Sequence, residues 1–155
     1  MPTLQLLVAA VLACASAAHA YDAAGAAGEE PAPGRIATAR AAIKANQWPV
    51  ALAELKIAVH EEPKSADAHN LLAYSYRKQA VPDLPKAFEH YTTALKLDPK
   101  HKGAHEYIGE AYLMDKRPAE AEKHLAELEK ICGNKACVEY GQLAQALTAY
   151  RARAR

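Results

Sequence analysis

Cys132 and Cys137 are the two residues whose type and spacing most directly suggest chemistry. They flank a four-residue segment in which Gly133 or Asn134 can adopt the left-handed conformation that ends a helix. A tight turn between two helices brings such cysteines to the Cα separation of ~6 Å that a disulfide requires. The spacing is neither the C-x-x-C of thiol oxidoreductases nor the C-x-x-C-H of haem attachment, and two cysteines do not make a zinc site. We therefore predict a structural disulfide, with free buried thiols and redox chemistry as the alternatives.

Seven histidines raise the question of a metal site. His101 and His105 are four residues apart, so they share a face if both lie on one helix. His69 and His105, however, occupy the same position in two segments that repeat each other, as the periodicity below shows. Repetition at one position is typical of packing, and no Cys or Asp accompanies these histidines at ligand spacing. We predict no metal site and no cofactor.

Two pairs of adjacent glutamates, Glu29–Glu30 and Glu61–Glu62, are the remaining candidates for acid–base chemistry. The sequence around them has no apolar surroundings that would shift a carboxyl pKa. It also lacks the G-x-S-x-G, H-E-x-x-H and glycine-rich phosphate-binding motifs. With 19 basic and 18 acidic side chains, the chain has no charge excess to steer it onto nucleic acid. We predict that the protein is not an enzyme and does not bind nucleic acid.

The elements that carry these residues follow a 34-residue period, and a turn two residues longer at residues 81–84 lengthens one interval to 36. A fixed period of about 20–50 residues indicates a repeat architecture instead of a single globular core. Apolar residues recur at helical spacing, and the second helix of each unit opens near a proline, which the first turn of a helix tolerates. Three helix pairs are predicted over residues 35–65, 66–99 and 102–133, followed by a capping helix with a basic tail over residues 134–155. The residues that mark the period are Ala51, Leu55, Ala58 and Pro63, then Ala87, Tyr91, Ala94 and Pro99, then Ala121, Leu125, Leu128 and Gly133.

The repeated residues resemble the pattern of the tetratricopeptide repeat family. That pattern places a bulky residue, Leu, Gly or Ala, Tyr, Ala, an aromatic residue, Ala and Pro at set positions of a unit of the same length. The resemblance covers about residues 32–133. It implies an all-α fold, an α-solenoid of three tetratricopeptide helix pairs plus a C-terminal capping helix. With its C-terminal Cys pair, the chain is also similar to small exported bacterial members of the family. The matching residues are His69, Leu72, Ala73, Tyr76, Ala87, Tyr91, Ala94 and Pro99 in the second unit, and His105, Ile108, Gly109, Tyr112, Ala121, Leu125 and Leu128 in the third.

The resemblance also implies where a partner binds. In this family the first helices of successive units line a groove, and certain exposed positions face the ligand. The groove of this chain should be basic and polar at one end, and acidic and apolar at the other. Lys44, Asn70 and Lys78 are loosely similar to the set that clamps a peptide carboxylate in some members, but Glu106 and Glu110 stand where further basic residues would be needed. The implied groove residues are Arg40, Lys44, Asn70, Tyr74, Arg77, Lys78, Glu106 and Glu110, joined by Ile43, Asp67, Leu113 and Met114.

Residues 1–20 have the character of a secretory signal peptide. The apolar run at residues 4–13 is too short to span a bilayer as a mature helix, and small residues then lead to an A-x-A sequence that ends at Ala20. We predict cleavage after Ala20, a periplasmic or secreted location, and a flexible linker at residues 21–34. No Lys or Arg precedes the apolar run, which is unusual for a signal peptide. The residues before Cys14 are loosely similar to a lipobox, so a lipid anchor at Cys14 is the alternative.

These observations predict an extracytoplasmic interaction module or scaffold that binds an extended or helical segment of another protein in its groove. Self-assembly is an alternative, since the N-terminal helix pair has no visible cap and another copy could cover it. A redox or metal-handling protein is a further alternative, which the Cys pair and the histidines would serve. The basic residues 151–155 are predicted to fray, with contact to phosphate or anionic lipid as the alternative.

Overall fold

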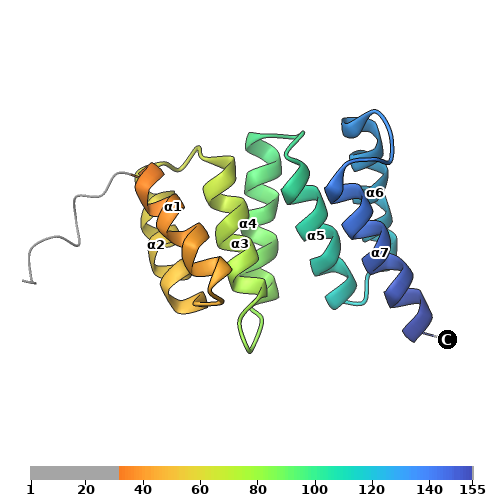
Figure 1. Cartoon of the computed structure of the whole chain (residues 1–155), viewed down its shortest axis with the longest axis horizontal. Coiled ribbons are helices and arrows are strands. Elements are labelled where there is room, and N and C mark those ends of the chain that lie inside the picture. Colours follow the sequence, from red (N-terminus) through yellow and green to blue (C-terminus); the bar gives the residue numbers. More distant parts are fainter. Residues whose placement is uncertain (1–31, 155) are drawn as a thin grey trace, which may run out of the picture.

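The computed structural model describes residues 32–154, and every regular element in that range is an α-helix. Figure 1 shows the helices standing side by side in one row, from α1 and α2 at one end to α6 and α7 at the other. Consecutive helices pack as the pairs α1–α2, α3–α4 and α5–α6, and α7 packs against both helices of the last pair. The predicted all-α solenoid of three helix pairs with a C-terminal capping helix is confirmed. The helices are α1 (Ala32–Lys44), α2 (Trp48–Glu61), α3 (Ala66–Arg77), α4 (Leu84–Leu97), α5 (Lys102–Met114), α6 (Pro118–Cys132) and α7 (Val138–Arg153).

The predicted signal peptide, its cleavage after Ala20 and the lipid-anchor alternative at Cys14 lie outside the described residues, as do residues 21–31 of the predicted linker. The last residues assigned to that linker are helical instead, because α1 begins at Ala32. Ala32 is 4% exposed and packs in one apolar cluster with Ala58 of α2. The burial of a small side chain against the neighbouring helix therefore extends α1 beyond the start that the periodicity indicates. Within residues 32–154, no helix is long and apolar enough to cross a membrane.

Helices α3 and α4 begin where a side chain accepts a hydrogen bond from an unpaired N–H group of the first turn. The Ser65 hydroxyl accepts a hydrogen bond from the backbone N–H of Ala68 at 3.3 Å, and the Asp83 carboxylate accepts one from Lys86 at 3.1 Å. Helices α2, α4 and α6 each carry a proline in their first two positions, where the missing N–H leaves no acceptor unpaired. Local sequence thus sets the helix starts at the regular spacing that a stack of pairs requires.

The alanines and the large apolar residues that mark the period pack in the core between the helices. Small side chains let helix axes approach closely, and larger ones fill the space between the crossings. Leu55, Tyr91 and Leu128 supply that filling and are all 0% exposed. The marker alanines are also 0% exposed: Ala51, Ala58, Ala87, Ala94 and Ala121.

Helix α7 closes the row by packing onto a notch at Gly109 of α5. A Cβ atom added at Gly109 would lie 2.6 Å from Cδ2 of Leu143, so any larger residue would force the Leu143 side chain to move. Leu143 and Leu147 are 0% and 2% exposed and share an apolar cluster with residues of α5 and α6. At the other end of α7, the Arg151 guanidinium reaches the Glu122 carboxylate of α6 at 2.6 Å. The capping helix is therefore fixed by packing along most of its length.

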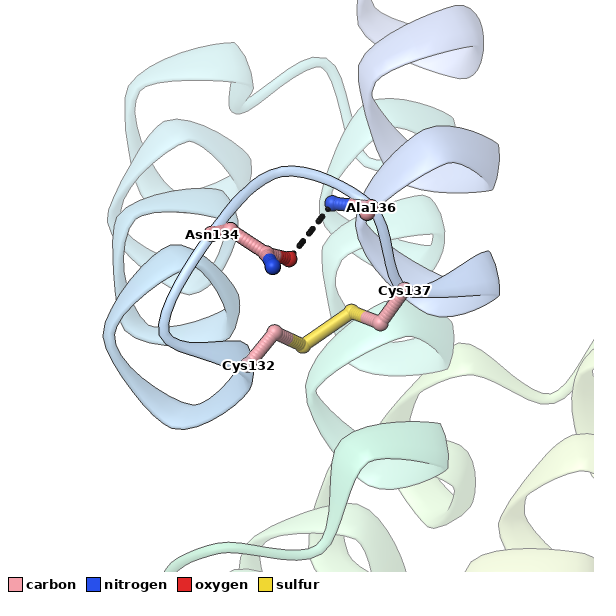
Figure 2. Close-up of a disulfide and its surroundings, with 4 residues drawn as sticks. All are labelled: Cys132, Asn134, Ala136 and Cys137. Atoms are coloured by element: carbon pink, nitrogen blue, oxygen red, sulfur yellow. Dashed lines mark hydrogen bonds between the residues drawn. A yellow bond between two sulfur atoms is a disulfide. The ribbon is translucent and has the colours of Figure 1, made fainter.

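The turn before α7 contains the Cys pair. Figure 2 shows the disulfide that joins Cys132, the last residue of α6, to Cys137, which immediately precedes α7; the two Cα atoms are 6.1 Å apart. Gly133 ends α6 with φ of 67°, a left-handed conformation that glycine adopts without strain. The side-chain oxygen of Asn134 accepts a hydrogen bond from the N–H of Ala136 at 2.9 Å. The turn and the disulfide together set where α7 starts relative to α6.

Candidate functional site

The first helices of the three pairs, together with α7, contribute the residues around a set of hollows, and we call this surface the groove face. Cavity A measures about 370 Å³ and lies between α1, α3 and α5. Cavity B measures about 460 Å³ and lies between α3, α5 and α7. A third hollow of about 550 Å³ shares Arg77, Lys78 and Glu110 with cavity B and extends along α7. Cavity A is lined by Arg40, Ile43, Lys44, Leu71, Tyr74 and Tyr107, and cavity B by Tyr74, Arg77, Lys78, Glu106, Tyr107, Glu110, Gln142, Gln145, Ala146 and Ala149.

One of the eight implied groove residues, Asn70, lines neither cavity. The family pattern implies an exposed position for Asn70, but only 3% of its surface is accessible. The start of α5 covers it: its side-chain nitrogen lies 3.4 Å from where a Cβ of Gly103 would be. The other seven implied residues lie around cavities A and B. These are Arg40, Lys44, Tyr74, Arg77, Lys78, Glu106 and Glu110.

Two tyrosines form a wall that the two cavities share. The ring centroids of Tyr74 on α3 and Tyr107 on α5 are 4.6 Å apart, and Trp48 meets Tyr74 edge-on at 6.0 Å. The Arg77 guanidinium lies 5.3 Å from the centroid of the Tyr74 ring and 5.8 Å from that of Tyr107. Burial, followed by the charge of Glu106, raises the pKa of Tyr107 to about 12, so its hydroxyl stays protonated at neutral pH. The wall therefore offers apolar ring surface and neutral hydroxyl groups.

Arg77 is a structural residue as well as a cavity wall. Its side chain is 6% exposed, and its Nη2 lies 2.7 Å from Oε2 of Glu110 on α5. Its Nε also donates to the hydroxyl of Tyr91 on α4 at 3.3 Å. Burial raises the pKa of Tyr91, which therefore remains a neutral acceptor. Arg77 thus ties three helices together beneath the groove face, and its charge is compensated by Glu110.

Glu106 differs from Glu110 in having no cation paired with it among the described residues. Only 5% of its surface is exposed. Burial, followed by the negative charges of Glu110 and Glu139, raises its pKa to about 8. With its amide oriented to donate, Gln142 of α7 places its nitrogen 2.7 and 3.1 Å from the two carboxyl oxygens. Glu106 is therefore a carboxyl group that is largely protonated at pH 7 and faces a cavity.

The basic end of the groove face is partly neutralised. Arg40 on α1 forms an ion pair with Asp67 on α3, and His101 Nε2 lies 3.8 Å from the other Asp67 oxygen. The hydrogen bond from His101, with that from Arg40, lowers the pKa of Asp67. Lys44, also at cavity A, is exposed. Of the two cations at cavity A, Lys44 is therefore the one that has no acidic partner among the described residues.

Two histidine pairs repeat from unit to unit, and neither is among the residues expected from the sequence to interact. His69 and His90 place their Nδ1 atoms 3.0 Å apart, and His105 and His124 do so at 2.9 Å. Nε2 of His69 lies 3.1 Å from the backbone carbonyl oxygen of Pro63, and Nε2 of His105 lies 3.0 Å from that of Pro99. A carbonyl only accepts, so Nε2 carries the proton and Nδ1 accepts from the partner ring. The signal was available, since His90 and His124 are separated by one 34-residue period.

These pairs are packing contacts between the two helices of a unit. Burial, followed by the charge of His105, lowers the pKa of His124 to about 4, and burial likewise lowers the pKa of His90. Both rings are therefore neutral at pH 7, and each stacks on a tyrosine of the preceding helix. In the part of the chain that the structure describes, no group of three or more His, Cys, Asp or Glu side chains could hold a metal ion.

Paired helices, a regular period and a hollowed face define this molecule as an α-helical repeat protein. A tetratricopeptide repeat family model matches residues 36–91 and again residues 83–136. The chain belongs to the tetratricopeptide repeat family. A search of curated proteins found no match to the sequence.

Solved structures with the same arrangement are distant in sequence. The type III secretion translocator chaperone SycD of Yersinia enterocolitica superposes with a TM-score of 0.69 at 14% identity, covering 80% of this chain and 94% of its own. The TPR2B domain of yeast Sti1, solved as a complex with pHsp70, gives 0.64 at 20% identity, covering 79% and 94%. The first TPR domain of human RPAP3 gives 0.64 at 15% identity, covering 77% and 94%. At these identities the likeness establishes the fold.

Proposed function

We propose that the protein is an exported interaction module whose groove face binds a segment of another protein. The observation that carries the proposal is the pair of cavities on either side of the Tyr74–Tyr107 wall. Hollows of about 370 and 460 Å³ accept side chains of one segment laid across the tyrosine rings. Membership of a family of stacked repeats supports a binding surface over an active site. Two of the similar structures are a translocator chaperone and a domain in complex with pHsp70, which agrees with a protein ligand.

Export is the part of this proposal that rests on the sequence. Residues 1–20 read as a signal peptide, and the Cys132–Cys137 disulfide is of the kind that persists in oxidising compartments. We place the protein in the periplasm or outside the cell, in line with its similarity to small exported bacterial members of the family. N-terminal sequencing of the purified native protein tests this. A mature chain that begins at Tyr21 supports the proposal, and an intact N-terminus in the cytosolic fraction contradicts it.

Partner binding is tested by charge reversal at the rim of the cavities. Lys44→Glu and Lys78→Glu alter two exposed residues of the groove face, and Lys96→Glu makes the same change at an exposed position of α4 that lines none of the hollows. Cross-linking in intact cells is followed by purification of each variant and identification of the attached protein. We expect a partner that the wild type and Lys96→Glu retain and that both groove variants lose. A partner held equally by all four proteins would place binding elsewhere.

The molecular mass of the protein in solution distinguishes self-assembly from binding of another protein. A concentration series of the purified protein in analytical ultracentrifugation gives a constant monomer mass if the groove face serves another protein. A mass that doubles as the concentration rises would favour self-assembly. If Lys44→Glu and Lys78→Glu leave that doubling unchanged, the copies associate through a surface other than the groove face.

A further inference from the structure

We infer that cavity B takes a lysine or arginine side chain of the bound segment, with Glu106 as its counter-ion. This inference rests on the proposed function and narrows it to one chemical class of ligand, a primary ammonium or a guanidinium group. It starts from a carboxyl group that the folded protein leaves without a cation. Glu106 lines cavity B and is 5% exposed.

The cation nearest to Glu106 is already committed. Arg77 directs Nη2 to Glu110 at 2.7 Å and Nε to the Tyr91 hydroxyl at 3.3 Å, and its Nη1 lies 3.8 Å from Sδ of Met114. Each nitrogen of that guanidinium therefore faces a partner other than Glu106. Since a buried charge is costly without a partner, an ionised Glu106 needs a cation that the described residues do not supply.

The groups that face Glu106 from the surrounding helices favour a cation over an anion in the cavity. Helix α5 itself contributes the Glu110 carboxylate and the Tyr107 ring, and α7 contributes Glu139 and the Gln142 amide. Helix α3 contributes Arg77, which Glu110 neutralises, and at the rim the exposed Lys78, whose Nζ lies 5.9 Å from the Tyr74 ring centroid. An anion in cavity B would be repelled by the Glu110 carboxylate and by an ionised Glu106, whereas both would attract a cation. Burial, followed by the charges of Glu110 and Glu139, holds the pKa of Glu106 at about 8. A cation bound in cavity B would lower that pKa again.

The remaining walls of cavity B suit a long cationic side chain. Tyr74 and Tyr107 present ring faces along which methylene groups pack and cations are attracted. Gln145 adds an amide whose oxygen can accept a hydrogen bond from an ammonium group. On the α7 side, Ala146 and Ala149 have small side chains that leave space in the cavity. The volume of about 460 Å³ leaves room for one such side chain and accompanying water.

The test begins with a library of phage-displayed random 12-residue peptides, panned at pH 8 on the full-length wild-type protein and on two variants. Glu106→Gln removes the charge and preserves the shape, and Glu89→Gln is the matched change at an exposed position of α4. We expect wild type and Glu89→Gln to enrich peptides that carry Lys or Arg at one shared position, and Glu106→Gln to lose that preference. An enriched peptide is then resynthesised with fluorescein, alongside an analogue in which norleucine replaces the basic residue.

Fluorescence anisotropy gives the dissociation constants as a function of pH. If the peptide cation binds ionised Glu106, the affinity for wild type rises by up to about fiftyfold between pH 6 and pH 8, because the ionised fraction rises from about 1% to about 50%. We expect this rise to be absent for the norleucine analogue and for Glu106→Gln, which should also bind the basic peptide at least tenfold more weakly at pH 8. Circular dichroism confirms that each variant is folded.

The outcomes separate the inference from the function beneath it. Enriched peptides without a basic residue, or with binding that is tighter at pH 6 or unchanged by Glu106→Gln, would overturn the assignment of cavity B and leave the groove-face proposal standing. A library from which no peptide is enriched on any of the three proteins would overturn both.

Discussion

Replacing Gly109 with alanine tests how α7 is attached. The added methyl group would lie 2.6 and 2.7 Å from the two Cδ atoms of Leu143 and 3.3 Å from its Cγ, so the whole end of that side chain must move. Leu143 is completely buried, and overpacking of this kind costs about 1–3 kcal/mol. Alanine in a helix regains about 1 kcal/mol relative to glycine. We expect a net loss of up to about 2 kcal/mol of unfolding free energy in urea, and a Tm lower by up to about 8 °C.

The chain provides its own control in Gly141 of α7. A Cβ atom at Gly141 meets nothing within 4 Å, so Gly141→Ala gains helix propensity without a clash. We expect it to stabilise the protein by about 0.5–1 kcal/mol. The two substitutions are chemically identical and should act with opposite sign. If Gly109→Ala stabilises the protein as much as Gly141→Ala does, α7 does not pack onto α5 in the way described.

Three further predictions concern the buried polar groups and the disulfide. As the pH falls from 6.5 toward 4, the unfolded chain binds a proton at His124 before the folded chain does, because burial lowers the pKa of His124 to about 4. The unfolding free energy, measured by urea titration at each pH, should therefore fall by about 2 kcal/mol over that interval, a value that allows for the partial exposure of the ring. The variant His124→Gln should show a smaller fall. Replacing Cys132 and Cys137 together with serine should cost about 2 kcal/mol in the chain-entropy model, and hydrogen exchange should increase in α7 while α1 to α4 are unaffected; equal increases in all helices would contradict a local role. Arg77→Leu leaves Glu110 and the Tyr91 hydroxyl without their partner and should cost about 2 kcal/mol in urea denaturation, whereas Lys78→Leu next to it should change the stability by less than about 0.5 kcal/mol.

The sequence was sufficient for the stacking of the helices, because that stacking depends on residues that repeat. Ala51, Ala87 and Ala121 are completely buried where helices cross, as their period predicts. The same logic would have revealed the partners of His69 and His105, since His90 and His124 are also one period apart. The spacing of His101 and His105 indicates a pair on one helix, whereas the contacts in the structure join His69 to His90 and His105 to His124, each between two helices.

The groove face could be located from the sequence, but the state of its side chains could not. Position along a repeat predicted that Arg77 and Glu106 lie at the cavities, as they do. It gave no sign that both are more than nine-tenths buried, because this depends on how α5 and α7 close around them. Gly109 occupies the small-residue position of the repeat, but α7 does not follow the period of the units, so the spacing did not identify α7 as the helix that packs there. The repeat pattern also implies that Glu110 is an exposed acidic residue facing a ligand, whereas in the structure Glu110 is the counter-ion of Arg77.

The notch at Gly109 has a consequence for how an array of this kind can grow. The junction between α2 and α3 and the junction between α4 and α5 are built alike, with His69 and His105 each bound to a prolyl carbonyl of the preceding loop. A duplicated unit inserted at either junction would meet surfaces that already fit it. A unit inserted after α6 would need to pack against α5 and α6, where α7 already packs, and it would therefore have to displace α7. Helix α7 thus blocks lengthening of the solenoid at its C-terminal end, and a unit inserted in the interior would leave the capping helix and its disulfide unchanged.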